Sequence, residues 1–165
     1  MKVFRVVADS SCLIALAQIE LFGLLKELFS EIYIPRAVYE EVVVKGRGEA
    51  GSGETESALG DRWISMKDVN DKTAINALRT ILGKGESEVI ILCKELRADY
   101  ALIDEKTARH TAELMSVDTM GVFGIMDLAI EMGFAIDKRY LIKQLRDVGF
   151  RISDKLYKTM FGDSK

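Results

Sequence analysis

Carboxylates follow two short, mostly apolar stretches of the chain. Residues 3–8 are largely β-branched or aromatic and Asp9 comes directly after them, while residues 100–103 read Tyr-Ala-Leu-Ile and are followed by Asp104 and Glu105. Runs of this length and character favour interior strands of a parallel sheet. Because ligands gather beyond the carboxyl ends of such strands, we expect Asp9 and Asp104 to lie at one edge of a sheet.

Two further acids lie between these stretches. Glu41 belongs to residues 36–44, where three valines predict the apolar stripe of a helix, and Glu86 opens a second helical pattern. Several carboxylates at one edge of a sheet repel each other and are costly to bury unpaired. Convergence of these acids would therefore imply a bound cation.

The residue types available restrict which cation this would be. Hard cations take oxygen ligands, so Mg²⁺ or Mn²⁺ is expected, and such an ion activates water for attack on a phosphate. His110 is the single histidine, which excludes zinc centres that need several imidazoles. Cys12 and Cys93 lie within apolar patterns, and we expect both to be reduced, buried thiols.

Each polar candidate also has an ordinary structural explanation. An Asp at a strand end commonly caps the following helix, Glu41 and Glu88 resemble solvated helix charges, and Glu86 would complement a helix dipole. Ser11 and Thr119 could hydrogen-bond the site, although a capping role suits both equally well. The recurrence of Asp after two apolar strands, with an acid opening the helix between them, is harder to explain by capping alone.

Contacts to phosphate would have to be local. The net charge of −3 provides no overall attraction for nucleic acid. Arg36, Lys84 and Arg109 fall at helix starts or beside the acids, where they could contact phosphates. His110 could do the same, and it is a weak candidate for a general base. Each of these residues taken alone is more often an ordinary surface charge.

Strands alternate with helices along the chain, which predicts an α/β fold with a parallel sheet. Strands are expected at 3–8, 31–34, 63–66, 100–103 and around Val117. Helices are expected after Asp9 and at 21–29, 36–44, 74–82, 86–97, 108–115, 121–132, 137–149 and 153–161. Residues 45–60 are rich in Gly, Ser and Glu, and we expect a mobile loop or weak helix there. Gly83 to Gly85 should end the preceding helix with a left-handed cap.

Size and composition indicate one globular domain spanning residues 1–165. The chain has 48% hydrophobic and 30% charged residues, values typical of a folded protein. Its apolar runs are too short to span a bilayer, and the N-terminus lacks the features of a signal peptide. We therefore expect a cytoplasmic protein with no membrane association.

Four segments together resemble the PIN domain family, and more narrowly a prokaryotic subgroup related to the ribonuclease toxins of toxin–antitoxin pairs. They read Asp-Ser-Ser-Cys-Leu-Ile-Ala-Leu at 9–16, Ile-Pro-Arg-Ala-Val-Tyr-Glu-Glu-Val at 34–42, Gly-Lys-Gly-Glu-Ser-Glu at 83–88 and Leu-Ile-Asp-Glu-Lys-Thr-Ala-Arg at 102–109. The similarity covers about residues 3–134. It leaves a C-terminal helical extension of about 135–165, which could cover a partner surface or a dimer interface.

The resemblance implies a three-layer α/β/α fold with a central parallel sheet of about four or five strands. It also implies a Mg²⁺- or Mn²⁺-dependent ribonuclease site and frequent homodimers, and many relatives are toxins paired with an antitoxin protein. By motif, the four acids of the site are Asp9, Glu41, Glu86 and Asp104. Glu88 competes with Glu86 for the third position, and Glu105 competes with Asp104 for the fourth.

Three functions follow from this reading. The first is a metal-dependent endoribonuclease that hydrolyses RNA phosphodiesters, which could be the toxin of a toxin–antitoxin pair. The second is a non-catalytic PIN-like module that binds RNA or protein. The third is another phosphohydrolase on the same type of sheet.

Overall fold

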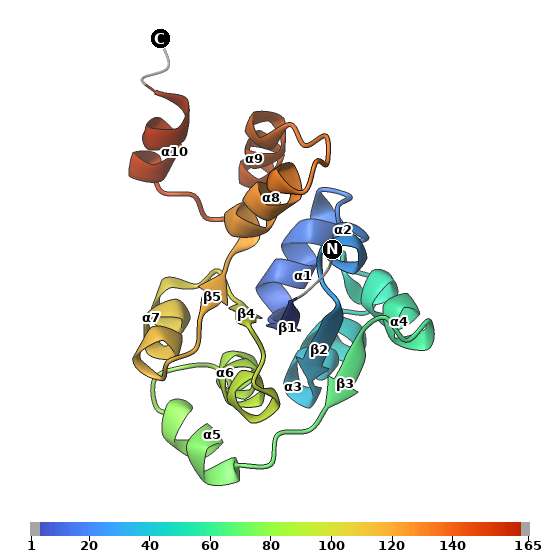
Figure 1. Ribbon diagram of the computed structural model, residues 1–165, viewed down its shortest axis with the longest axis vertical. Coiled ribbons are helices and arrows are strands. Elements are labelled where there is room, and N and C mark those ends of the chain that lie inside the picture. Colours follow the sequence, from blue (N-terminus) through green and yellow to red (C-terminus); the bar gives the residue numbers. More distant parts are fainter. Residues whose placement is uncertain (1–3, 163–165) are drawn as a thin grey trace.

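Five parallel strands form one sheet in the computed structural model, which describes residues 4–162. The strands are β1 (Arg5–Ala8), β2 (Glu31–Pro35), β3 (Ser65–Lys67), β4 (Tyr100–Leu102) and β5 (Thr119–Met120), in the spatial order β3-β2-β1-β4-β5. Figure 1 shows this sheet at the centre of the molecule. The predicted α/β fold with a parallel sheet of four or five strands is confirmed.

β1 is the central strand, and its sequence explains this position. Val6, Val7 and Ala8 are completely buried because helices cover both faces of the strand. Val6 pairs with Ile32 of β2 on one side and with Tyr100 of β4 on the other. Asp9 follows directly after β1, and its backbone N–H continues the pairing by donating to the Leu102 carbonyl at 3.0 Å. The residues after β1 and β4 therefore meet at one edge.

Helices complete the three layers. On one side of the sheet lie α3 (Arg36–Tyr39), α5 (Lys72–Leu78), α6 (Lys84–Leu96) and α7 (Lys106–Leu114), and α6 packs directly against β1, β2 and β4. On the other side lie α1 (Ser10–Gln18), α2 (Leu24–Leu28) and α8 (Val122–Glu131), and α1 and α2 both contact α8 (Figure 1). The remaining elements are a π-helix, η1 (Glu40–Lys45), and the helices α4 (Ser52–Gly60), α9 (Lys138–Asp147) and α10 (Asp154–Phe161).

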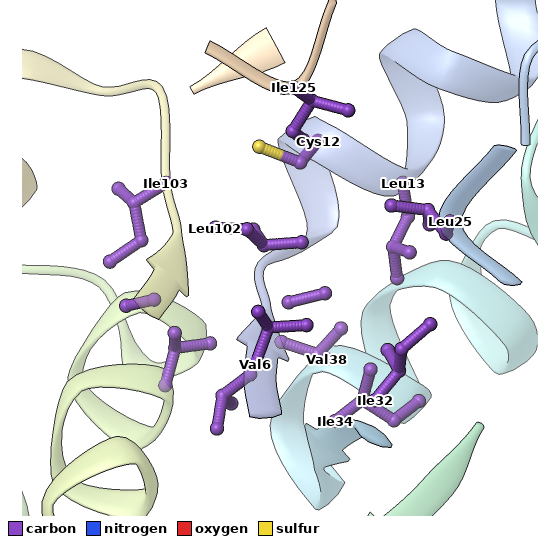
Figure 2. Packing of buried hydrophobic residues seen from close by; sticks show 14 of the residues in the cluster. Val6, Cys12, Leu13, Leu25, Ile32, Ile34, Val38, Leu102, Ile103 and Ile125 are labelled. Carbon is purple, nitrogen blue, oxygen red and sulfur yellow. The ribbon is translucent and has the colours of Figure 1, made fainter. Parts of the chain in front are cut away.

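The core joins the sheet to both helical layers. Figure 2 shows Val6 beside Leu102 and Val38, with Leu13 of α1 close to Leu25 of α2. Burial of such side chains contributes about 1.5–3 kcal/mol each. The apolar residues around Asp9 and Asp104 thus form a rigid base from which the two acids project.

Several predicted boundaries were close, and a few were wrong in detail. Residues 63 and 64 precede β3, and Val117 precedes β5, because the strand pairing itself begins at Ser65 and Thr119. Val3, predicted in the first strand, lies outside the described residues. The predicted helix at 36–44 divides into α3 and η1, so the chain changes from α-helical to wider π-helical turns at Glu40.

Residues 45–60 form more structure than their composition predicted. A turn at 46–51 leads into α4, which buries Ser52, Thr55 and Ala58 against the rest of the molecule. The turn contains Gly48 and Gly51 at φ values of 88° and 95°, which glycine adopts without steric cost. The glycines therefore shape the turn, and α4 is stabilised by packing against α1 and η1.

The glycines at 83 and 85 play a different role from the one predicted. α5 ends at Leu78, and no left-handed glycine caps it, because Gly83 has an ordinary φ of −67°. Gly83 is instead the N-cap of α6, which begins at Lys84. As a result Glu86 lies in the first turn of α6, where its negative charge interacts favourably with the helix dipole.

No helix among residues 4–162 combines the length and the apolar character needed to cross a lipid bilayer.

Candidate active site

A pocket of about 500 Å³ lies at the carboxyl ends of the strands. Its walls come from the start of α1, from α3 and η1, from the start of α6 and from the residue that caps α7. The residues lining it are mostly acidic, basic or small, namely Asp9, Ser10, Ser11, Ala37, Glu40, Glu41, Lys45, Gly83, Lys84, Gly85, Glu86 and Glu105. Three of the four predicted acids therefore share one pocket.

Asp9 is the most deeply placed of these acids. Its residue is only 5% exposed, and burial raises the pKa of its carboxyl group to about 7, with smaller contributions from the charges of Glu86 and Glu41. Ser11 Oγ donates to Asp9 Oδ2 at 3.3 Å. Asp9 occupies the N-cap position of α1, but its side chain accepts no capping hydrogen bond. The carboxylate lines the pocket, where the backbone of Ser10 at the start of α1 partly offsets the effect of burial on its pKa.

Glu41 lies close to Asp9 in the pocket. Its Oε2 accepts a hydrogen bond from Ser10 Oγ at 2.9 Å, which ties η1 to the start of α1. Gly85 separates the two acids, since a Cβ at this glycine would lie 3.1 Å from Glu41 Oε2 and 3.8 Å from Asp9 Oδ1. The absence of a side chain at Gly85 therefore leaves a small space that both carboxylates border.

Glu86 and Glu88 have different surroundings although they are two residues apart. Glu86 lines the pocket, and its pKa is raised by partial burial and by the charges of Glu105 and Glu41. Glu88 is 8% exposed, and its Oε1 accepts a hydrogen bond from the backbone N–H of Ala37 at 3.2 Å. Glu88 thus stabilises the first turn of α3, while Glu86 faces the other acids.

Asp104 is held beside the pocket and does not line it. Its Oδ1 accepts from the backbone N–H of Val122 at 3.0 Å, and its Oδ2 accepts from Cys12 Sγ at 3.1 Å. Burial raises the pKa of Asp104. A Cβ at Gly121 would lie 2.5 Å from Asp104 Oδ1, so only glycine leaves room for this carboxylate.

Cys12 connects Asp104 to Asp9. The thiol is completely buried, as predicted, and its pKa is raised well above the usual value by burial and by the charges of Asp104 and then Asp9. Both strand-end acids therefore lie around the first turn of α1. Cys93 is also a free, buried thiol, as predicted.

Glu105, the alternative to Asp104 as the fourth acid, has a structural role. Glu105 is exposed at the pocket rim and caps α7, since its Oε2 accepts from the Ala108 N–H at 2.7 Å. Thr119 lies at the start of β5 and does not line the pocket.

The predicted phosphate contacts are also separated by the structure. Lys84 lines the pocket, whereas Arg36 is exposed and forms a bidentate ion pair with Asp68 at 2.8 and 3.2 Å. Arg109 lies near Asp104, because both would contact a Cβ at Gly121. Sequence reasoning missed Lys45, which also lines the pocket; its helix face depends on the π-helical turns of η1.

The donor set suits a hard cation, although the side chains are not closed around one point. Among residues 4–162, no group of three acidic, histidine or cysteine side chains is already placed to hold a metal ion. After burial, the charges of Glu86 and Glu41 help to raise the pKa of Asp9, and those of Glu105 and Glu41 help to raise the pKa of Glu86. Carboxylate oxygens that repel one another in a half-open pocket fit Mg²⁺ or Mn²⁺, which keep several waters.

Comparisons with known proteins identify the fold and the family of the chain. The chain is similar in structure to a PilT N-terminus domain protein from the hyperthermophilic archaeon Sulfolobus solfataricus, with 17% sequence identity and a TM-score of 0.58 over 79% of this chain and 96% of that one. At this identity the likeness shows the fold alone. No curated protein matches the sequence. A family model described as a PIN domain matches residues 5–164, which include the sheet, the pocket and the C-terminal helices. The chain therefore belongs to the PIN domain family.

Proposed function

We propose that the protein is a metal-dependent endoribonuclease that hydrolyses RNA phosphodiesters. The observation that carries this proposal is the convergence of Asp9, Glu41 and Glu86 on one pocket at the carboxyl ends of the strands. The nuclease-type fold of the PIN domain family, which generally uses divalent metal ions, supports it. Asp104, placed beside Asp9 around Cys12, is the fourth acid of the proposed site.

Each acid has a distinct part in the proposal. Asp9, Glu41 and Glu86 would hold one Mg²⁺ or Mn²⁺ through their oxygens, and Asp104 would bind through water or hold a second ion. A divalent cation supplies charge stabilisation for the phosphate undergoing attack and makes water more acidic. Ser10 and Ser11 orient Glu41 and Asp9 through their hydrogen bonds. Lys84 and Lys45, at the pocket wall, would attract the phosphates of the substrate.

The direct test is cleavage of a labelled single-stranded RNA by purified protein in Mn²⁺. We expect Asp9→Asn to lower kcat by about 100-fold or more, because it removes the ligand charge at the centre of the site. Asp61→Asn, at an exposed position, is the matched control and should leave the rate unchanged. Equal cleavage by the Asp9→Asn variant and the wild type would overturn the assignment.

The nature of the substrate is tested in the same preparation. RNA, single-stranded DNA and a small phosphate ester are offered in parallel, and we expect RNA to be cleaved fastest. Preferred hydrolysis of the ester would identify a different phosphohydrolase. If calorimetry shows no Mn²⁺ binding while RNA binding persists, the protein is a non-catalytic RNA-binding module.

Self-association and pairing with an antitoxin remain part of the proposal. We propose a homodimer in solution, which light scattering at several concentrations would test. We also propose that the nuclease is the toxin of a toxin–antitoxin pair, in which case induced expression should arrest growth and Asp9→Asn should relieve the arrest. Unimpaired growth with active wild-type protein would contradict the toxin role.

A further inference from the structure

The C-terminal extension has the opposite charge from the rest of the chain. Residues 135–165 contain eight Lys and Arg against four Asp and Glu, whereas the whole chain contains 23 against 26. The first 134 residues are therefore left with 15 cations and 22 anions. A polyanion near the acidic pocket is repelled by the domain core and attracted by the extension.

The first part of this basic segment packs against α8. α9 packs beside α8, where Lys138 forms an ion pair with Asp127 at 2.6 Å. Phe150, just after α9, contacts Phe123 with their ring centroids 6.1 Å apart. Phe123 directly follows Val122, whose N–H holds Asp104. The link between α9 and α10 therefore packs against the first turn of α8, the helix whose start holds Asp104.

Contacts between α9 and α10 leave several cations available. Arg139 and Arg146 stack over the rings of Phe161 and Tyr157, and Arg146 also pairs with Asp154 at 3.7 Å. These contacts hold α10 against α9, and Figure 1 shows α10 projecting away from the strands. In the part of the chain that the structure describes, the exposed cations of the extension without an ion-pair partner include Lys143, Arg151, Lys155 and Lys158.

An exposed aromatic ring accompanies these cations. Tyr140 on α9 is 58% exposed, and its hydroxyl accepts a hydrogen bond from Gln144 Nε2 at 3.0 Å, which orients the side chain. Lysines that track a backbone, together with a ring on which a base can stack, are the elements with which proteins bind single-stranded nucleic acid. The positive charge disfavours an apolar partner, and the exposed ring of Tyr140 favours RNA over an acidic protein, which has no bases to stack on it.

We propose that α9 and α10 form a surface that binds single-stranded RNA and so retains the substrate on the protein. This inference rests on the proposed function for the identity of the ligand. It gives the extension a role in substrate capture, separate from the chemistry of the four acids. The basic extension would offset the repulsion between RNA and the acidic remainder of the chain, whose net charge does not favour nucleic acid.

The test measures binding of a fluorescent single-stranded RNA of about 20 nucleotides by anisotropy, with EDTA present so that cleavage cannot occur. The triple variant Lys143→Gln, Lys155→Gln and Lys158→Gln should raise Kd about tenfold at about 0.1 M salt and lower the slope of log Kd against log salt by about 2. The matched triple variant Lys72→Gln, Arg79→Gln and Arg97→Gln removes exposed cations at the start of α5, directly after α5 and directly after α6, and it should change both quantities much less. Tyr140→Ala should raise Kd about fivefold or more.

The same variants separate this proposal from the ribonuclease proposal. In Mn²⁺ the extension variant should raise KM and leave kcat unchanged, because the four acids are intact. If the wild type fails to cleave RNA but the losses of binding are as expected, the ribonuclease function fails and the RNA-binding surface stands. Equal Kd values for the two triple variants would overturn the surface, as would a loss of self-association by the extension variant with unchanged RNA binding.

Discussion

The carboxyl group of Asp9 is buried, so its ionisation should lower the free energy of unfolding by a measurable amount. In the folded protein its pKa is raised from 3.8 to about 7, chiefly by burial. Between these values the folded state retains a proton that the unfolded state releases. The free energy of unfolding of metal-free protein should therefore fall as the pH rises from about 4 to about 7 and then level off.

The Asp9→Asn variant should lack this fall in the free energy of unfolding, because asparagine has no acidic proton to lose. At pH 8 the metal-free variant should be more stable than the wild type by on the order of 2 kcal/mol, since each pKa unit corresponds to about 1.4 kcal/mol and relaxation reduces the full value. At pH 4 the two should be nearly equal. Urea unfolding in EDTA at both values measures this difference. A variant that is less stable than the wild type at pH 8 would show that the Asp9 carboxylate is satisfied without a cation.

Substitutions of Glu86 and Glu88 should have different effects, the first on RNA cleavage and the second on the stability of the fold. Glu86→Gln should lower RNA cleavage by about 100-fold with the free energy of unfolding nearly unchanged, because the side chain lines the pocket and is partly exposed. Glu88→Ala should destabilise the fold by about 1–2 kcal/mol, because the Ala37 N–H loses its acceptor. Cleavage assays and urea unfolding on both variants test the pair, and the reverse pattern would make Glu88 the third acid.

At the scale of elements, α4 shows how packing overrides composition. Ser52 Oγ donates to the Val43 carbonyl at 3.1 Å, whereas Thr55 Oγ1, also buried, is without a hydrogen-bond partner in the described part of the chain. Thr55→Val should therefore stabilise the protein by about 1 kcal/mol, and Ser52→Ala should destabilise it by a similar amount. Thermal unfolding distinguishes the two, and destabilisation by Thr55→Val would indicate that a bound water satisfies the hydroxyl.

The elements also show which predictions depend on local pattern. The strands and most helices were predicted because apolar runs and helical periodicity are properties of neighbouring residues. For α4 the sequence left a mobile loop and a weak helix as alternatives, because the stability of this helix comes from contacts with α1 and η1 that lie outside its own segment. The cap at Gly83 was assigned to the wrong helix, since a glycine between two helices suits the end of one and the start of the next equally well.

At the scale of the whole molecule, bound metal should couple stability to pH. Asp9 must lose its proton to bind a cation, so Mn²⁺ should bind about tenfold more weakly at pH 6 than at pH 8. At 100 times its Kd, Mn²⁺ should add about 2.7 kcal/mol to the free energy of unfolding. Thermal unfolding with and without Mn²⁺ at both pH values measures the coupling, and Asp9→Asn should abolish it. A metal effect that is equal in the variant would place the ion elsewhere.

The sequence by itself determined the α/β fold class, the parallel sheet, the PIN domain family resemblance and the presence of Asp9 and Asp104 at strand ends. These follow from residue types and short-range spacing. The helical pattern also favoured Glu86 over Glu88 as the third acid. Residues two apart point to roughly opposite sides of an α-helix, and Glu86 is the one that leaves Val89, Ile90 and Cys93 on the inward face. The tertiary structure decided which side chains share the pocket: Asp9, Glu41 and Glu86 line it, Asp104 stands beside it against Cys12 and Val122, and Arg36 is paired with Asp68. Convergence depends on the order of the strands and on how helices distant in sequence pack over them, which no local pattern contains.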